Sequence, residues 1–194
     1  MIIVGLGNPG SEYSKSRHNT GRIILETIAD KFDFSLWKNE SKYKLERSKG
    51  DINGRKFDFI LPDTFMNNSG NAVAVFIKDK KKLRDLVVIY DDIDLPFGSY
   101  KISFNKSSGG HKGLESIIKK VKSKEFVRIR VGISSKTSKG RAKKPKGEEA
   151  VLKYLLGNFK EDELKELKKI SKEIALVLEL ISKEGKDKAM SVYN

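Results

Sequence analysis

The sequence predicts a single compact α/β domain over residues 1–194, with a mixed, mostly parallel central sheet flanked by helices. Short apolar runs, which predict strands, alternate along the chain with segments whose apolar residues recur at helical spacing. The run from Leu86 to Tyr90 is continuously apolar, as expected of a central strand covered on both faces. A chain of 194 residues without internal repeats is long enough for one well-buried core.

The first twenty residues predict a buried strand that leads into a tight turn and a polar loop. Three apolar, β-branched residues start at Ile2, and a segment rich in glycine and proline follows through Gly10. Asn8 stands at the end of this strand. The loop after it carries His18, one of only two histidines, and a helix is expected over about 21–32.

The middle of the chain continues the alternation of strands and helices. Asn53-Gly54 predicts a hairpin turn, because both residues tolerate a positive φ. The remaining expected elements are hairpin strands at 43–49 and 55–61, a polar loop at 64–70, a helix through 72–77, strands near 86–90, 99–104 and 126–133, and a helix near 111–123.

Two segments near the C-terminus differ from this pattern. Residues 135–147 hold six basic residues and almost no apolar ones, which predicts a mobile basic loop. That loop is either a solvated linker or a segment that closes on a phosphate backbone. Residues 161–185 carry a single apolar stripe at helical spacing, so a C-terminal amphipathic helix is expected to dock on the core.

Composition limits the chemistry that the chain can perform. With 40 Lys and Arg against 26 Asp and Glu, the net charge of +14 favours polyanionic partners such as nucleic acid. The absence of cysteine excludes disulfides, thiolate catalysis and thiolate metal sites. No run approaches the ~18 apolar residues of a membrane span, and the start does not read as a signal peptide. We therefore expect no membrane partner and a cytoplasmic location.

A candidate catalytic pair follows from the predicted sheet. Functional groups gather at the carboxyl ends of parallel strands, and Asp91 comes directly after the strand at 86–90. If that strand neighbours the first one, His18 can reach Asp91. A carboxylate on one imidazole nitrogen fixes the tautomer and raises the basicity of the other nitrogen. Water is then the expected nucleophile, because no cysteine or serine elbow is present.

Other interpretations of these residues remain open. Asp91, Asp92 and Asp94 resemble a site for a hard cation such as Mg²⁺, which would suit a metal-dependent phosphoesterase. A noncatalytic RNA-binding protein on the same fold would explain the charge equally well. His111 follows two glycines at a predicted helix start, where the helix dipole disfavours imidazolium, so a neutral hydrogen-bonding role is expected.

Several uncommon motifs occur together and in a fixed order. They are GLGNPG followed by Tyr13 and RHN, then TFMNNSG, DDIDLP, GGHKGLESI, RIRVGI and YLLGNF. In this order and spacing the chain resembles bacterial peptidyl-tRNA hydrolase from Ile2 to about Phe159. The resemblance implies a monomeric α/β enzyme without a metal or other cofactor. Such an enzyme hydrolyses the ester between a peptide and the 3′-terminal ribose of tRNA.

The resemblance also implies roles for individual residues. His18 matches the catalytic base and Asp91 its carboxylate partner. The residues implied to contact the substrate near the ester, the peptide or the tRNA end are Asn8, Tyr13, Met66 and Asn67. Arg130 matches a basic residue that clamps the 5′-phosphate, and the expected partner is the acceptor arm and 3′ end of peptidyl-tRNA.

Two positions depart from the family pattern. Lys112 stands where the family usually has an asparagine that holds the catalytic water or stabilises the reacting centre. A lysine can donate hydrogen bonds but cannot accept them, so it suits an oxyanion or a terminal phosphate better than a water. Ser103 stands where the second clamp residue is commonly lysine, and Lys101 and Lys106 are close enough in sequence to replace its charge.

Overall fold

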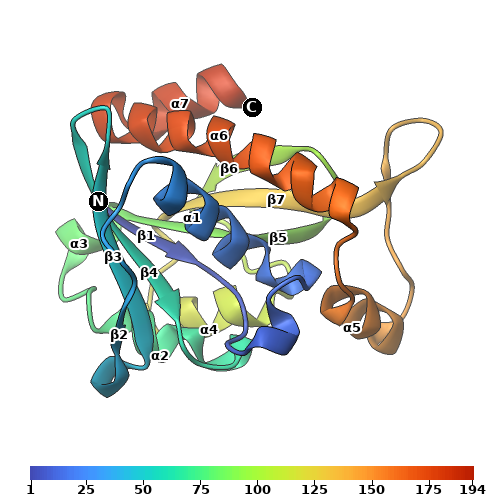
Figure 1. The fold of residues 1–194 in the computed structure, drawn as a ribbon, viewed down its shortest axis with the longest axis horizontal. Coiled ribbons are helices and arrows are strands. Elements are labelled where there is room, and N and C mark those ends of the chain that lie inside the picture. The colour runs from blue at the N-terminus through green and yellow to red at the C-terminus, as the bar shows by residue number, and fades with distance from the viewer.

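A single mixed sheet forms the centre of the molecule in the computed structural model, which describes residues 1–194 (Figure 1). The strand order is β2-β3-β4-β1-β5-β7-β6, with β8 paired to β7. The four central strands β4, β1, β5 and β7 run parallel, and the other pairings are antiparallel. The strands are β1 Ile2–Gly5, β2 Lys38–Glu40, β3 Leu45–Ile52, β4 Arg55–Pro62, β5 Leu86–Pro96, β6 Tyr100–Phe104, β7 Val127–Lys136 and β8 Ala142–Lys143. This arrangement confirms the predicted fold class.

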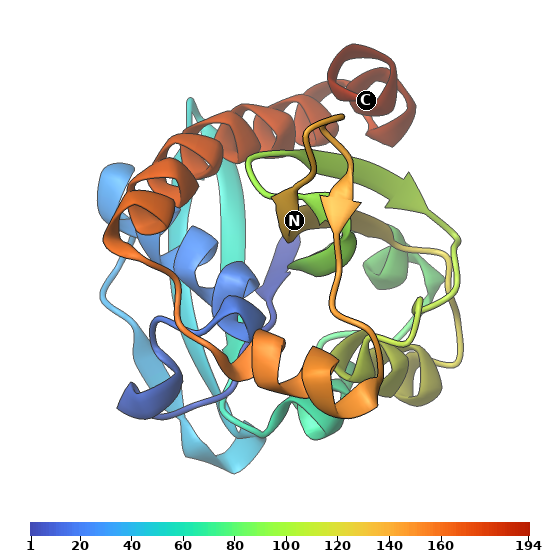
Figure 2. The same cartoon turned by 90° about the vertical axis from the view of Figure 1, so that its right-hand side faces the viewer.

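Helices cover both faces of this sheet. They are α1 Thr20–Lys31, α2 Ser69–Ala74, α3 Lys80–Arg84, α4 Lys112–Val121, α5 Glu148–Leu156, α6 Glu161–Glu184 and α7 Lys186–Tyr193. Helices α1, α6 and α7 contribute to the larger apolar cluster on one face, whereas α2 and α4 pack in the smaller cluster on the other. Figure 2 shows α6 and α7 along one side of the sheet, and α5 with β8 at the end facing the viewer.

The two clusters follow from the period of two along each strand. Val87 and Ile89 belong to the larger cluster, and their neighbours Leu86 and Val88 belong to the smaller one. All four side chains are fully buried, as the continuous apolar run predicts for a parallel strand covered on both faces. The register aligns Val4 of β1 with Val88 of β5, so the two strands are the neighbours that the proposed catalytic pair requires.

The strand at 86–90 is longer than predicted. Asp91, Asp92 and Asp94 lie within β5 and do not follow its end, because pairing with β7 continues to Pro96 opposite Ser134. The register shifts between Asp92 and Pro96, so β5 is irregular where it carries Asp94. The acidic residues therefore lie within a strand and do not form one loop cluster.

Other boundaries also differ from the sequence prediction. Helix α2 ends at Ala74, so the expected helix through 77 is wrong at Val75, Phe76 and Ile77. The segment 135–147 is not entirely loop, because Ser135 and Lys136 of β7 pair with Lys143 and Ala142 of β8. Its mobility stays a prediction.

Besides β8, four helices and strands were not expected from the sequence: β2, α3, α5 and α7. The first three are short, and α7 follows α6 after a single glycine at positive φ, which ends one helix and starts the next. The C-terminal amphipathic helix at 161–185 is confirmed as α6, with Leu167, Ile174 and Leu178 on its buried face. No helix in the structure is both long and apolar enough to cross a membrane.

Candidate active site

The loop that carries His18 is tied firmly to the end of β1. Asn19 accepts a hydrogen bond from the backbone N–H of Asn8 (2.8 Å) and donates one to the Asn8 carbonyl (2.9 Å). His18 lies next to this anchor in a short 3-10 turn, Arg17–Asn19, and is buried. Asn19 therefore fixes the position of His18. The sequence analysis did not predict this role for Asn19.

His18 and Asp91 form a buried pair, as the sequence predicted. Nδ1 of His18 lies 3.0 Å from both carboxylate oxygens of Asp91, although the residues are 73 positions apart. Burial alone would lower the pKa of His18, but the charge of Asp91 and its hydrogen bond outweigh burial and raise that pKa. Because Nδ1 faces the carboxylate, Nε2 is the nitrogen left to take a proton.

His111 binds the same carboxylate from the other side. Its Nε2 lies 3.1 Å from Oδ1 of Asp91, and its Nδ1 accepts the backbone N–H of Leu114 at the start of α4 (3.2 Å). A ring nitrogen that accepts carries no proton, so His111 is neutral and donates from Nε2. This geometry agrees with the predicted neutral role, but no sequence pattern indicated the contact with Asp91.

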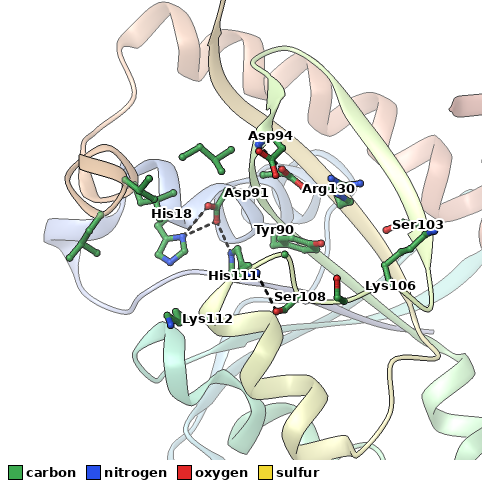
Figure 3. A pocket seen from close by; sticks show the side chains of 18 of the residues that line it. His18, Tyr90, Asp91, Asp94, Ser103, Lys106, Ser108, His111, Lys112 and Arg130 are labelled. Atoms are coloured by element: carbon green, nitrogen blue, oxygen red, sulfur yellow. Dashed lines mark hydrogen bonds and ion pairs between the residues drawn. The ribbon is translucent and has the colours of Figure 1, made fainter. Parts of the chain in front are cut away.

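These two imidazoles stabilise the negative charge of Asp91. Burial would raise the pKa of Asp91, but His18 and His111 together hold it well below its usual range. Asp91 therefore stays ionised and keeps both rings oriented. The close-up in Figure 3 shows the carboxylate between the two imidazoles.

The predicted alternative of a cation site built by three aspartates does not fit this geometry. Asp92 accepts a hydrogen bond from Nε of Arg130 (2.6 Å), and Asp94 accepts one from Nζ of Lys144 (2.6 Å). Asp91 is occupied by the two histidines. Each carboxylate thus has its own cationic or hydrogen-bonding partner, and the three do not converge on one point.

The ligand atoms of His18, Asp91 and His111 do lie within 4.8 Å of one another, a spacing that a metal ion would accept. In this structure, however, they satisfy one another by hydrogen bonds. The remaining nitrogen of His111 is used by Leu114. The donor set therefore fits an oriented imidazole base better than a metal centre.

The residues predicted to contact the peptide lie on the segments that follow β1 and β4. Oδ1 of Asn8 accepts the backbone N–H of Met66 (2.8 Å), so its amide nitrogen remains a free donor. Met66 is buried under α4, where a Cβ added to Gly113 would come within 2.4 Å of its sulfur. Asn67 is exposed and Tyr13 is half-buried.

A pocket of about 580 Å³ opens next to His18 (Figure 3). Lys112, Lys106 and Arg130 line it, as do Asp91 and His111. Ser103 also lines it, and its buried hydroxyl has no hydrogen-bond partner. Asn8, Tyr13, Met66 and Asn67 lie outside this pocket. Lys101 is opposite Arg130 in the β6–β7 pairing but does not line the pocket either.

Comparisons with known proteins identify the family of this chain. The family model described as peptidyl-tRNA hydrolase matches residues 2–194. The chain belongs to the peptidyl-tRNA hydrolase family. The match covers the chain beyond Phe159, where the sequence motifs end, and it includes α6 and α7.

Individual relatives span the same length. The peptidyl-tRNA hydrolase of Fusobacterium nucleatum is 39% identical over 198 residues, covering 100% of this chain and 95% of the relative. That of Thermodesulfovibrio yellowstonii is 38% identical, with 100% and 98% covered. The crystal structure of peptidyl-tRNA hydrolase from Acinetobacter baumannii superposes with a TM-score of 0.85 at 30% identity, covering 100% of this chain and 95% of that one.

Proposed function

We propose that this protein hydrolyses the ester between the peptide and the 3′-terminal ribose of peptidyl-tRNA, using water activated by His18. The observation that carries this proposal is the buried His18–Asp91 pair, whose free nitrogen borders the pocket. Nε2 takes a proton as the water oxygen attacks the ester carbonyl. The proton then passes to the departing ribose 3′-oxygen, which leaves a free carboxylic acid and an intact tRNA.

Two side chains are available as donors for the developing oxyanion. The amide nitrogen of Asn8 is free to donate, because its oxygen is held by Met66. The ammonium of Lys112 borders the same pocket at the start of α4. Donors aimed at the reacting oxygen stabilise the transition state more than the ground state. Asn8 and Lys112 therefore replace the solvent that would otherwise stabilise the charge.

The two ends of the substrate bind on different sides of the ester. Asn67, Met66 and Tyr13 hold the peptide side, and basic groups hold the acceptor arm of the tRNA. Arg130 is tied to Asp92 only through Nε, so its terminal nitrogens are free for a phosphate. Lys106 borders the pocket. Lys101 of β6 is exposed and lies opposite Arg130 of β7.

The enzyme works as a monomer, since every proposed catalytic and binding group belongs to one chain.

The decisive experiment measures release of N-acetyl-amino acid from N-acetyl-aminoacyl-tRNA by the wild type and by His18→Ala, with and without EDTA. Loss of the base should lower turnover by about 10²–10⁴-fold. Binding of deacylated tRNA should change little, and EDTA should have no effect on the wild type. Cleavage that EDTA abolishes would favour the metal-dependent phosphoesterase. Tight tRNA binding by folded wild type without cleavage would favour the noncatalytic RNA-binding protein.

A further inference from the structure

The loop that carries His18 is joined to the C-terminal part of the chain through the residues just before this histidine. The backbone N–H of Arg17 donates to the Gly157 carbonyl (3.0 Å). In the opposite direction, the N–H of Phe159 donates to the Lys15 carbonyl (2.8 Å). These two hydrogen bonds align the loop with the connection between α5 and α6 (Figure 2).

The side chain of Arg17 packs into the same connection. The Cζ atom of its guanidinium lies 4.6 Å from the centre of the Tyr154 ring and 5.4 Å from that of Phe159. Its Nη2 donates to Glu163 in the first turn of α6 (3.3 Å), and the side chain is only 14% exposed. A cation is attracted to an aromatic face, most strongly where water is excluded. Arg17 therefore connects both α5 and α6 to the loop that carries the base.

The groups that hold Arg17 are themselves fixed to the body of the protein. The hydroxyl of Tyr154 donates to the Ile133 carbonyl of β7 at 2.7 Å. Phe159 is buried in the larger apolar cluster. Gly157 packs so closely that an added Cβ would lie 3.1 Å from Nη1 of Arg17. The Arg17 side chain therefore occupies a rigid, closely fitted site.

His18 thus has an anchored residue on each side. Asn19 ties the loop to Asn8 at the end of β1, and Arg17 ties it to the connection between α5 and α6. The imidazole itself is held by the hydrogen bond of its Nδ1 to Asp91. A catalytic group works well only when its supports keep it within about 0.5 Å of the productive geometry. The orientation of His18 against Asp91 therefore depends on Arg17 as well as on Asn19.

We propose that Arg17 is a positioning residue that holds His18 against Asp91 and makes the base depend on the seating of α5 and α6. Arg17 does not line the pocket, and its guanidinium binds Glu163. Asp91 is the charged group that raises the pKa of His18. Loss of the Arg17 side chain should therefore displace the imidazole without removing a substrate contact. The effect on turnover rests on the proposed function, whereas the effect on His18 itself does not.

The first test measures the titration of His18 by NMR, which is simple because the chain has only two histidines. The spectrum of His18→Ala identifies the resonances. In Arg17→Met the pKa of His18 should fall from its raised value toward the ordinary 6.5, because the imidazole is released from Asp91. Arg17→Lys keeps the charge but loses the planar group that packs on the rings, so it should cause a smaller shift in the same direction. Lys15→Met removes an exposed ion pair with Glu161 in the same region (2.9 Å) and should titrate as wild type.

The second test measures cleavage of N-acetyl-aminoacyl-tRNA by the same variants. Arg17→Met should lower kcat by about tenfold, while KM stays within about twofold of wild type. The acidic limb of its pH profile should move in the same direction as the NMR titration. Lys15→Met should match wild type in rate and pH profile.

Two results would overturn the inference. One is a wild-type titration of His18 in folded Arg17→Met and Arg17→Lys, and Arg17→Lys alone decides if Arg17→Met does not fold. The other is a rise in KM with unchanged kcat, which would make Arg17 a substrate contact. Failure of folded wild type to cleave the ester would instead reject the proposed function, and the titration would still decide whether Arg17 positions His18.

Discussion

The position of one buried carboxylate decides how the proposed base works. Asp91 is 3% exposed and receives hydrogen bonds from two imidazoles, one from the loop after β1 and one from the start of α4. A buried charge is tolerated when it is paired and hydrogen-bonded, and Asp91 meets this condition without a lysine or arginine. Its charge therefore acts on His18, where it raises the basicity of the free nitrogen.

Replacing Asp91 with asparagine should shift the pH dependence of the reaction. His18 must be neutral to accept a proton, and its raised pKa places the acidic limb of kcat/KM above pH 6.5. Asp91→Asn removes the negative charge, so the pKa of His18 falls and the limb moves to lower pH, while the plateau rate also falls. Kinetics from pH 5 to 9 measure both effects. An acidic limb that stays in place would show that another group controls the rate.

Lys112 offers a second test at the residue scale. Lys112→Met keeps most of the length of the side chain but removes its charged donor, and we expect kcat to fall by about tenfold or more. Lys112→Asn should recover much of this loss, because an amide also donates. Lys119→Met on the same helix, exposed and outside the pocket, is the matched control. Equal rates in Lys112→Met and wild type would remove Lys112 from the proposed oxyanion site.

At the scale of elements, the segment from β8 through α5 closes one side of the pocket with little buried surface. Its basic part contacts β5 through the ion pair of Lys144 with Asp94, in which both side chains are more than half exposed. Exposed pairs of this kind contribute little to stability. The segment is therefore the part of the pocket wall that should open most easily.

Limited digestion with trypsin tests this expectation. The six basic residues between 135 and 147 supply cleavage sites, and we expect the first cuts after Lys139, Arg141 or Lys146, identified by mass spectrometry. Bound tRNA should slow these cuts if the segment closes on the phosphate backbone. Equal cleavage with and without tRNA would support the solvated-linker interpretation. First cuts in α6 or α3 would contradict the predicted mobility.

At the scale of the whole molecule, the net charge of +14 should make the reaction strongly dependent on salt. Each phosphate contact adds to the slope of log kcat/KM against log salt concentration. Arg130→Gln should reduce that slope by about one. Lys38→Gln changes the net charge equally but lies on β2, at the sheet edge opposite β6, and should leave the slope unchanged. Identical slopes for both variants would mean that Arg130 does not contact a phosphate.

The sequence alone determined the features that depend on local pattern and composition. Apolar periodicity predicted most of the strands and helices, since burial on one or two faces imposes a period on the chain. The pairing of His18 with Asp91 was predictable from two apolar runs that were expected to form neighbouring parallel strands. Asp91 directly follows one run, and His18 lies on the loop after the other. The motif order predicted the family, which the full-length match confirmed.

Only the tertiary structure decided which distant groups meet. The second imidazole on Asp91 depends on where α4 begins relative to β5, and no local pattern encodes that distance. The separation of Asp92 and Asp94 onto Arg130 and Lys144 depends on how β5 pairs with β7, including the register shift between Asp92 and Pro96. Helix α5 lines the pocket with apolar side chains, and its position is set by the hydrogen bond from Tyr154 to Ile133 of β7. These contacts join residues far apart in sequence, so they are set by packing and register and not by propensity.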